Sequence, residues 1–585
     1  MTFFNKPTQW ALLLGLLLAV PSLWVGMQLD DYFHWGLVTQ RSQVLQTVSP
    51  ASPYGLFSFV DGNPARVMDL MNLGLAPWWT YPQVEYAFWR PLTEVTHGLD
   101  YSLWPQYPML MHVHSLLYFA LMLWCGFRLF KLIQGESTAW IWAVFLFALS
   151  YTHGVPVGWL ANRNAVLAVI FVILTLHYHH DGRETDRGLL NLRASLCFTL
   201  GLLCGEMAVT AGAYLFAYAV FLEKGSWRER MFSLAPYVVI GAAWLGMRSL
   251  LGYGASGSGH YVDLFQSPLM FLQVLVGRGL DLLGGLFWVI PPELGSGLPE
   301  IRRPVFLLLF LILLWLSWPL LQSDRRARFW LAGSLFCLVP VASTIPHSRL
   351  LIAASVGAAG FLGLFLQAWR SGRLAGSGPT KSLTAIMGGL LLVLQLGLSS
   401  LLLPMEMVSM RIVGDNYLNK GARAWDLGDI PRGTTPILIN PPLSSAGGYI
   451  NGVRAYLGLP VASKTWLLAS GLQPLSLTVL NDYTFDLYSK EGLYDAVQEG
   501  VLRGPQAPFA VGDSVQLAGM IVTVMEVKRG VPVRARYQFA HPITSDYYRF
   551  SHWNSGKVTL CRLPAKNQSI ELRVDSTHCA EPEAG

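Results

Sequence analysis

The chain has 585 residues, of which 53% are hydrophobic and only 13% are charged. A soluble globular domain is about 25% charged, so this composition excludes an ordinary soluble enzyme and indicates a membrane protein. The 21 Trp and 23 Tyr are typical of side chains at membrane–water interfaces. The formal net charge of +6 is modest, and we expect no nucleic-acid partner.

The first apolar run ends abruptly in two carboxylates. Residues 10–27 are all apolar or small except Ser22, and the run is close to the length that a helix needs to cross a bilayer. Asp30 and Asp31 follow directly, and His34 comes next on the same stretch. Charges held near lipid need water or a cationic partner. The acidic pair is therefore either a stop signal at the water boundary or a catalytic site that faces a lipid-linked substrate.

Ten further apolar runs follow a long polar loop. They lie near 108–127, 138–151, 156–178, 194–204, 206–222, 231–251, 304–321, 329–345, 350–368 and 383–403. Lys and Arg are concentrated in every second connection, which places the N-terminus in the cytoplasm and the loop 28–107 outside. Residues 25–27 do not form a small-x-small cleavage site, so we expect the first span to stay uncleaved. The pattern predicts a polytopic protein with about eleven spans.

Two other stretches of the membrane part carry specific expectations. The outer loop contains the pair Trp78-Trp79, which suits a membrane interface. Residues 268–292 are apolar but are interrupted by Arg278, Asp281 and several Gly. We expect these residues to form a re-entrant or interfacial hairpin rather than a span.

The C-terminal third differs in composition from the rest of the chain. Alternating or β-branched stretches at 521–527 and 569–574 are typical of strands, and residues 437–440 before a helical pattern predict one βα unit. We therefore expect a mostly α membrane domain over 1–404 and an extracytoplasmic α+β or β-rich domain over 405–585.

This topology has a consequence for compartment and cysteines. In a bacterium, the membrane domain would lie in the inner membrane and the C-terminal domain in the periplasm. Cys561 and Cys579 would then face an oxidising space, where they could form a disulfide.

Several polar residues lie where apolar ones would be less costly. Arg90 and Glu94 are one helical turn apart, and a local surface ion pair is the simple alternative to a role in a site. Glu206 interrupts an apolar stretch, where an unpaired carboxylate is costly. His112 and His114 do not share a helical face, so we expect no metal site from them alone. The remaining candidates at outer ends of the runs are Asp100, Arg163, Asn164, His347 and Arg349.

These residues resemble the motifs of the GT-C class of integral-membrane glycosyltransferases, above all the transmembrane protein O-mannosyltransferases with tetratricopeptide repeats and their bacterial relatives. The resemblance covers roughly residues 10–370. Its motifs are Arg90-Pro91-Leu92-Thr93 with Asp100-Tyr101 and Pro108…His112; Trp159…Arg163-Asn164; Glu206 with Ala208-Val209-Thr210; and Arg349 with Ser355-Val356-Gly357. Two features depart from the class: Gly205 replaces the usual Lys before the intramembrane Glu, and the repeats are absent, replaced by 405–585.

The resemblance implies a glycosyltransferase (EC 2.4 class) that moves a sugar, with inversion, from a polyprenyl-phosphate carrier to an acceptor hydroxyl. It favours Asp30 over Asp31 as the base, because the first acid of the pair is the more usual base in this class. The residues fit this chemistry independently, since a carboxylate can deprotonate a hydroxyl and the planar Arg fork binds phosphate oxygens. The expected substrate-binding residues are His34, Arg90, Glu94, Asp100, His112, Arg163, Asn164, Glu206, His347 and Arg349.

Three questions stay open at this point. Asp30 and Asp31 could hold a divalent cation, Mg²⁺ or Mn²⁺, through oxygen ligands, but no further ligands are evident. The acceptor could be a glycan, a lipid or a protein. A transporter or flippase of lipid-linked saccharide is the rival function, although transporters place charges near the bilayer midplane and often repeat their halves. A non-catalytic scaffold of the same fold is a third alternative.

Overall fold

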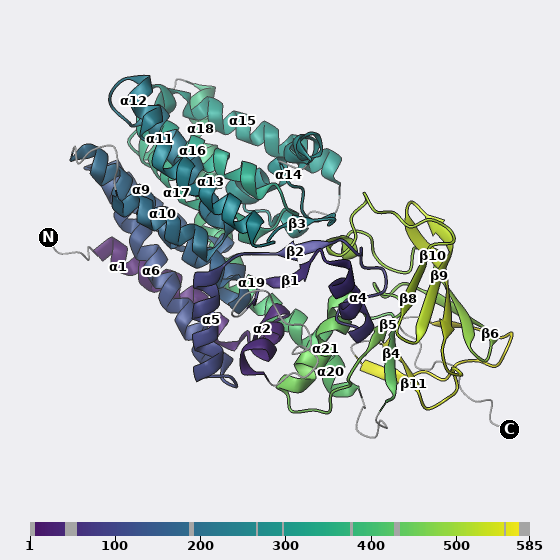
Figure 1. Ribbon diagram of the computed structural model, residues 1–585. Helices are drawn as coiled ribbons and strands as arrows, with labels where there is room; N and C mark the ends of the chain where they lie inside the picture. The colour runs from purple at the N-terminus through teal and green to yellow at the C-terminus, as the bar shows by residue number, and fades with distance from the viewer. Residues whose placement is uncertain are drawn as a thin grey trace.

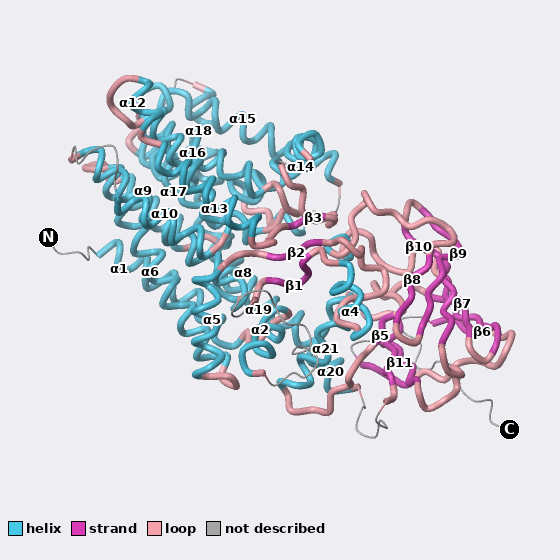
Figure 2. The backbone as a smooth tube through the Cα atoms, in the orientation of Figure 1, coloured by secondary structure: helices cyan, strands magenta, loops and turns pink. Residues whose placement is uncertain are grey.

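The computed structural model describes residues 6–40, 55–185, 192–264, 267–294, 298–374, 378–425, 433–554 and 557–572. A helical bundle and a β-rich domain lie side by side, and elements of the first outer loop lie between them (Figure 1). Figure 2 shows the same division, with strands concentrated in the C-terminal domain.

The bundle contains most of the helices. They are α1 (Lys6–Ala19), η1 (Val20–Trp24), α6 (Pro108–Gln134), α7 (Ala139–Ala148), η2 (Tyr151–His153), α8 (Gly154–Gly158), η3 (Leu160–Asn162), α9 (Arg163–Glu184), α10 (Leu192–Cys204), η4 (Glu206–Val209), α11 (Thr210–Phe221), α12 (Trp227–Phe232), α13 (Ala235–Leu250), α14 (Pro268–Trp288), η5 (Pro292–Leu294), α15 (Pro299–Ser323), α16 (Arg325–Val341), η6 (Ser348–Leu351), α17 (Ile352–Arg370), α18 (Pro379–Leu392), η7 (Val393–Leu398) and α19 (Ser399–Gly414).

Eight helical stretches of the described chain are long and apolar enough to cross a membrane, by length and composition. The number is nine if α7 and the segment Tyr151–Gly158, which are bent by 44°, form one span. The predicted count of about eleven is not confirmed. One reason is that α10 has only 13 residues, which at 1.5 Å per residue covers about 20 Å of the roughly 30 Å hydrocarbon core.

Helix α17 occupies the centre of the bundle because small residues let its neighbours approach closely. A Cβ added at Gly357 would lie 2.7 Å from a carbonyl oxygen of α16, and one at Gly360 would lie 2.5 Å from the ring of Trp330. A Cβ at Gly363 would lie 2.8 Å from a carbonyl oxygen of α7. In a membrane, where apolar burial does not drive helices together, such close packing supplies much of the association.

Helix α14 corrects one expectation. Residues 268–288 form one continuous helix, so the predicted hairpin is wrong. Arg278 donates to a backbone carbonyl at the C-terminal end of α16 at 3.1 Å. Asp281 binds Arg302 and Arg303 of α15, each at 2.8 Å. The polar residues that interrupt this run are therefore satisfied by neighbouring helices, and the backbone does not need to break.

The first outer loop forms structure of its own. Its elements are α2 (Asp30–Thr39), β1 (Ser58–Asp61), α4 (Pro64–Leu73), β2 (Glu85–Ala87) and α5 (Pro91–Leu103). Strands β1 and β2 pair antiparallel, and β3 (Ala255–Ser256), which follows α13, pairs with β2.

The pair Trp78-Trp79 does not lie at a membrane interface as expected. Both side chains are fully buried in a core shared with the C-terminal domain. Trp78 donates to the carbonyl of Leu468 at 3.0 Å, and the Trp79 ring stacks on Tyr494 with centroids 5.1 Å apart. The two indoles therefore anchor the outer loop to the C-terminal domain.

The C-terminal domain is β-rich, as the sequence predicts. Its elements are α20 (Lys420–Ala424), β4 (Thr435–Ile439), α21 (Ser444–Tyr456), β5 (Trp466–Leu467), β6 (Leu475–Asn481), β7 (Thr484–Tyr488), η9 (Glu499–Val501), β8 (Ser514–Leu517), β9 (Met520–Lys528), β10 (Val531–Phe539), β11 (Tyr548–Asn554), β12 (Lys557–Leu560) and β13 (Ser569–Leu572). One sheet has the order β13-β6-β7-β10-β9-β8 and is antiparallel, and the other has the order β12-β11-β4-β5.

The expected βα unit is confirmed. Strands β4 and β5 pair in parallel, and α21 connects them. The predicted boundary between residues 404 and 405 falls inside α19, and the helix continues through η8 (Asp415–Asn419) into α20. Cys561 is disulfide-bonded, whereas its expected partner Cys579 lies outside the described residues.

The orientation of the bundle gives a testable prediction. If the alternation of basic connections sets the topology, a reporter fused after Arg373 will be cytoplasmic, and a reporter fused to the C-terminus will be extracytoplasmic. Paired alkaline phosphatase and fluorescent-protein fusions measure this directly. Finding both fusion sites on the same side of the membrane would contradict the predicted topology.

Candidate active site

The two acids at the start of α2 have different surroundings. Asp31 is fully buried; one carboxylate oxygen accepts from the backbone N–H of Gln28 at 2.8 Å and the other accepts from that of Ala161 at 2.7 Å. Both acids lie in the first helical turn, where the helix dipole favours negative charge. Asp31 therefore holds the loop against the start of the α9 segment, with both oxygens occupied.

The turn before α2 is strained. Leu29 has φ of 40°, in the left-handed region that non-glycine residues rarely adopt. Such strain costs of order 1–3 kcal/mol and is commonly found at functional sites. The bond from Gln28 to Asp31 spans this turn, and the bond from Ala161 ties it to the segment before α9.

Asp30 instead lines a cavity. One carboxylate oxygen accepts a hydrogen bond from the hydroxyl of Tyr449, a residue of the C-terminal domain. Burial raises the pKa of Asp30, and the Tyr449 hydrogen bond together with the charges of Arg349 and Arg90 acts in the opposite direction. Asp30 is thus the member of the acidic pair that can contact a substrate, and its second oxygen accepts no hydrogen bond from the described residues.

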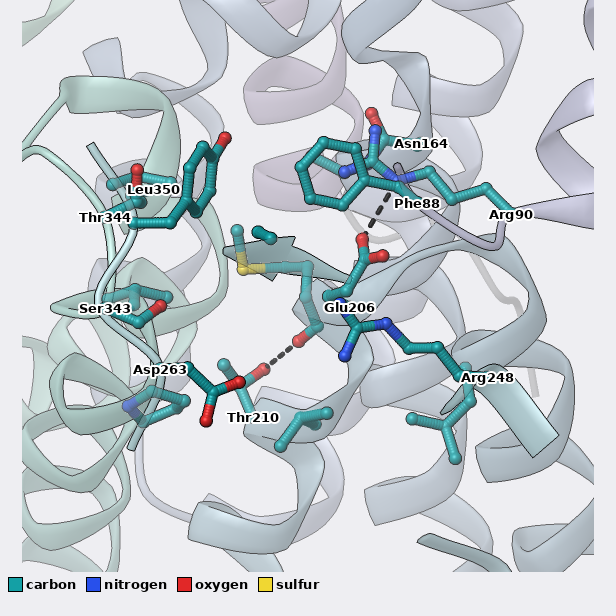
Figure 3. Close-up of a pocket in the computed structure, with 18 of the residues that line it drawn as sticks. Phe88, Arg90, Asn164, Glu206, Thr210, Arg248, Asp263, Ser343, Thr344 and Leu350 are labelled. Carbon is teal, nitrogen blue, oxygen red and sulfur yellow. Dashed lines mark hydrogen bonds and ion pairs between the residues drawn. The ribbon is translucent and has the colours of Figure 1, made fainter. Parts of the chain in front are cut away.

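The cavity has a volume of about 800 Å³ and combines charged and apolar walls. Its charged side chains come from α2, the segment after β2, η4, the last turn of α13, the segment before α14 and η6. These residues are Asp30, Arg90, Glu206, Arg248, Asp263 and Arg349. In Figure 3, Asp263 and Ser343 lie on the side of the cavity opposite Arg90.

Arg90 is held in place by a long-range partner. Its Nε donates to Glu206 at 2.9 Å, and its guanidinium lies 4.8 Å from the Phe57 ring and 4.4 Å from the Phe88 ring (Figure 3). The alternative of a local surface pair with Glu94 is wrong, because Glu94 is buried in α5 and Arg90 pairs with a residue 116 positions away. Asn164 also lines the cavity.

Two further cations in the cavity have no carboxylate within 4.0 Å in the part of the chain that the structure describes. Arg349 lies over the ring of Trp159 at 5.3 Å, and its buried Nε has no hydrogen-bond partner there. The buried Nε of Arg248 is likewise without a partner among the described residues, and its side chain extends into the cavity (Figure 3). A buried donor without a partner is costly, and both donors are suited to an anionic ligand.

The rest of the cavity wall is apolar and comes from the bundle. Helices α10, α11, α13, α14 and α16 contribute Phe198, Leu202, Phe216, Trp244, Leu245, Phe271, Phe336 and Val339, among others. Phe216, Leu245 and Phe336 are each about two-fifths exposed, so this part of the wall is open on the surface of the bundle. The charged end and the apolar part are thus continuous.

Several predicted residues lie outside the cavity. Asp100 and Arg163 form a fully buried pair at 2.6 Å, and His114 lies 2.6 Å from the other oxygen of Asp100. Arg163 also donates to Ser115 at 3.1 Å and to the carbonyl of Met111 at 2.8 Å. This cluster connects α5, α6 and α9, so its role is to hold together the elements that carry the site.

The predicted histidines also surround the cavity without lining it. His112 donates to the carbonyl of Gly26 at 3.0 Å and fixes the chain before the acidic pair. His34 is fully buried, with the Phe57 ring at 4.8 Å, and burial lowers its pKa to about 3, so it stays neutral. His347 accepts from the backbone N–H of Arg349 at 3.4 Å, and burial lowers its pKa to about 4.

The acidic pair fits a divalent cation poorly. Both oxygens of Asp31 accept backbone N–H groups, and one oxygen of Asp30 accepts from Tyr449. Within the described residues no group of three or more His, Cys, Asp or Glu could hold a metal ion. We therefore assign no step to a metal.

Sequence reasoning missed four residues of the site or its immediate surroundings. Arg248 had a usable signal, since it is a basic residue in the last turn of a run whose end the charge alternation places outside. Tyr86 and Asp263 line the cavity but sit in stretches without a distinctive pattern. Tyr449 reaches Asp30 from 419 positions away, and nothing in the local sequence indicates this contact.

Comparison with known proteins gives limited information. No protein-family model matches the chain, and no curated protein matches it. Among solved structures, the chain is similar to the Archaeoglobus fulgidus oligosaccharyltransferase tethered with an acceptor peptide containing the NVT sequon, with 10% identity, a TM-score of 0.42, and coverage of 80% of this chain and 64% of that chain. For the apo form the identity is 11%, the TM-score 0.40 and the coverage 80% and 65%. The chain therefore spans less than two thirds of the length of these structures.

Proposed function

We propose that this chain is a membrane glycosyltransferase of the GT-C class, which transfers a sugar from a polyprenyl-phosphate carrier to an acceptor hydroxyl. The observation that carries this proposal is that the Asp30 carboxylate and the Arg349 guanidinium, which has no carboxylate within 4.0 Å among the described residues, line one cavity whose apolar wall comes from the bundle helices. A lipid-linked anionic donor has the same two halves, an apolar chain and a charged head.

In this reaction the carboxylate and the guanidinium groups of the cavity have different roles. Asp30 takes the proton of the acceptor hydroxyl on its free oxygen while the acceptor oxygen bonds to the anomeric carbon. The bond from that carbon to the phosphate oxygen breaks, and the phosphate leaves with the electron pair. Arg349 and Arg248 hold its negative charge, because guanidinium groups stay charged and bind phosphate oxygens bidentately. A single displacement of this kind inverts the anomeric centre.

The cations of this cavity offset the missing lysine before Glu206. A Cβ at Gly205 would lie 3.0 Å from the Asn164 amide nitrogen, so this position is packed closely against a cavity residue. Arg248, in the last turn of α13, supplies a cation to the same space. Phosphate binding in this chain is therefore assigned to Arg248 and Arg349.

The position of the charges favours a transferase over a transporter. The cavity charges come from loops, short 3₁₀ segments and a helix end, whereas a transporter needs charged groups near the bilayer midplane. Transport also requires no new covalent bond. A transferase therefore yields a glycosylated acceptor that can be measured, and a transporter does not.

The deciding experiment uses the full chain purified into nanodiscs. It is incubated with a panel of polyprenyl-phosphate sugars and candidate acceptors, and products are identified by mass spectrometry. We expect release of the free polyprenyl phosphate together with a glycosylated acceptor. Flipping of intact donor across liposomes without any turnover by any member of the panel would support the transporter and overturn the proposal.

The apolar part of the cavity gives a second prediction. A Cβ at Gly212 in α11 or at Gly241 in α13 would meet nothing within 4 Å, and both residues line the cavity. The leucine side chains of Gly212→Leu and Gly241→Leu should therefore occupy space that the lipid chain of the donor would otherwise fill. We expect kcat/KM for a long-chain donor to fall by about tenfold, which corresponds to a loss of about one to two kcal/mol of apolar burial.

Gly246→Leu is the matched control. Gly246 lies on α13 and also has open space around its Cβ position, but it does not line the cavity. We expect this variant to turn over the long-chain donor normally, and we expect all three variants to accept a short-chain donor. Equal losses of kcat/KM for the long-chain donor in Gly241→Leu and Gly246→Leu would contradict the assignment of this cleft to the lipid chain.

A further inference from the structure

Helix α21 of the C-terminal domain lies directly against α2, the helix that carries the acidic pair. A Cβ at Gly452 would lie 3.5 Å from the Cβ of Tyr32, and a Cβ at Gly448 would lie 2.9 Å from the carbonyl of Leu75. The rings of Tyr32 and Tyr456 meet edge to face with centroids 5.6 Å apart. Glycines on α21 therefore allow it to fit closely between α2 and the segment after α4.

This packing brings Tyr449 to the active site. Its hydroxyl donates to one oxygen of Asp30, and Asp30 also faces the cavity. Burial and the adjacent Asp30 raise the pKa of Tyr449 well above its ordinary value, so the phenol keeps its proton and acts only as a donor. One oxygen of Asp30 is thus occupied by Tyr449, which leaves the other for the acceptor hydroxyl.

We propose that Tyr449 is a positioning residue for Asp30, so that the C-terminal domain completes the active site that the membrane domain begins. The inference rests on the proposed function, because it gives Asp30 the role of the base. Asp30 alone, on a short helix after a strained turn, could rotate about its side-chain bonds. The Tyr449 hydroxyl selects one orientation and stabilises the ionised form that accepts a proton.

Other groups near Asp30 also affect its pKa, so the test must separate the Tyr449 hydrogen bond from their electrostatic effects. The titratable and charged groups that face it from neighbouring elements are Asp31, Tyr86, Arg90, Tyr101, Arg349 and Tyr449. Of these, only Tyr449 donates a hydrogen bond to it among the described residues. Removing this one hydroxyl changes the hydrogen bond while the other charges stay in place.

Tyr449→Phe in the full chain tests the proposal, with Tyr456→Phe as the matched control. Tyr456 lies on the same helix and contacts α2 through its ring, with no hydrogen bond to either acid. Loss of a hydrogen bond to a charged group should lower kcat of Tyr449→Phe about 10- to 100-fold, with little change in the KM for donor. The acid limb of kcat/KM should move upward by about one pH unit, because the hydrogen bond favours the ionised carboxylate.

The outcomes are distinct. Normal kcat and an unchanged pH profile in Tyr449→Phe would overturn the inference. Equal losses of kcat in Tyr449→Phe and Tyr456→Phe would overturn it too, because they would show that Tyr449 acts only through packing between the domains. A readout that needs no turnover separates it from the proposed function: the pH midpoint for carbodiimide labelling of Asp30, followed by mass spectrometry. That midpoint should rise in Tyr449→Phe and stay fixed in Tyr456→Phe, whether or not the chain proves to be a transferase. Loss of turnover in Asp30→Asn, by contrast, tests the proposed function alone.

Discussion

Asp30→Asn is expected to lower turnover of the lipid-linked sugar by about two to four orders of magnitude, the usual cost of losing a general base. Asparagine keeps the size of the side chain and can still accept from Tyr449, but its amide cannot take the acceptor proton. The variant should fold, since Asp30 lines a cavity and its side chain accepts one hydrogen bond from the described residues, which asparagine can also accept. Single-turnover assays with a saturating donor measure the effect on the chemical step.

Asp31→Asn should behave differently. Its two oxygens accept the N–H groups of Gln28 and Ala161, and an amide cannot accept both. We expect the free energy of unfolding to fall by about 1–3 kcal/mol, seen as a lower melting temperature. Turnover should fall only indirectly, because the loop that carries Asp30 is displaced. Asp61→Asn is the control, because Asp61 lies in the same outer loop, pairs with Arg66 and does not line the cavity. Near-normal turnover in both Asp30→Asn and Asp31→Asn would make the acidic pair a boundary marker.

If the proposed function holds, the wild-type chain should also show the environment of Asp30 in its pH profile. Burial raises the pKa of this carboxyl, and only the ionised form can accept a proton. Activity should therefore fall as the pH drops through the raised pKa, at a higher pH than an ordinary aspartate would give. Asp30→Asn should abolish this acid limb in its residual activity.

Arg349→Lys is expected to lower kcat/KM for the donor by about 10- to 100-fold, although the positive charge is kept. Lysine offers a point charge in place of the planar fork, and it loses the contact of the guanidinium with the ring of Trp159. The effect should appear in donor handling because Arg349 has no carboxylate partner within 4.0 Å in the described chain. Steady-state kinetics with varied donor at fixed acceptor measure it.

Arg66→Lys provides the comparison for this variant. Arg66 pairs with Asp61 in the outer loop, and neither residue lines the cavity. We expect its kinetics to match the wild type. Donor kinetics of Arg349→Lys that equal those of Arg66→Lys would exclude Arg349 from phosphate binding and shift that role to Arg248.

The sequence located part of this site because charge near lipid is costly and therefore informative. Asp30, Arg90, Glu206 and Arg349 are polar residues that the sequence places where apolar ones would be less costly, and all four line the cavity. The same rule could not separate substrate contacts from structural pairs. Arg163 is one of the predicted substrate-binding residues, yet its charge is matched by the buried carboxylate of Asp100 on α5.

Long-range packing explains most of the remaining differences. The indoles at 78 and 79 were expected at a lipid interface, because nothing local indicates a domain 390 residues further on. The contact between Tyr449 and Asp30 could not be predicted for the same reason. The predicted span count is not confirmed, in part because α10 is too short to cross a membrane alone, and a hydropathy pattern does not show where a helix breaks.

The continuous helix from α18 to α20 connects the membrane to the C-terminal domain without a flexible linker. Its π turn at 415–419 contains Asn419, which accepts from the hydroxyl of Tyr32 on α2. A span whose apolar length differs from the local hydrocarbon thickness tilts, and a helix that continues past the span carries that tilt beyond the bilayer. The domain that supplies Tyr449 would then shift with it. Bilayer thickness is thereby linked to the geometry around Asp30, and the lipid composition of the host membrane is expected to tune the rate.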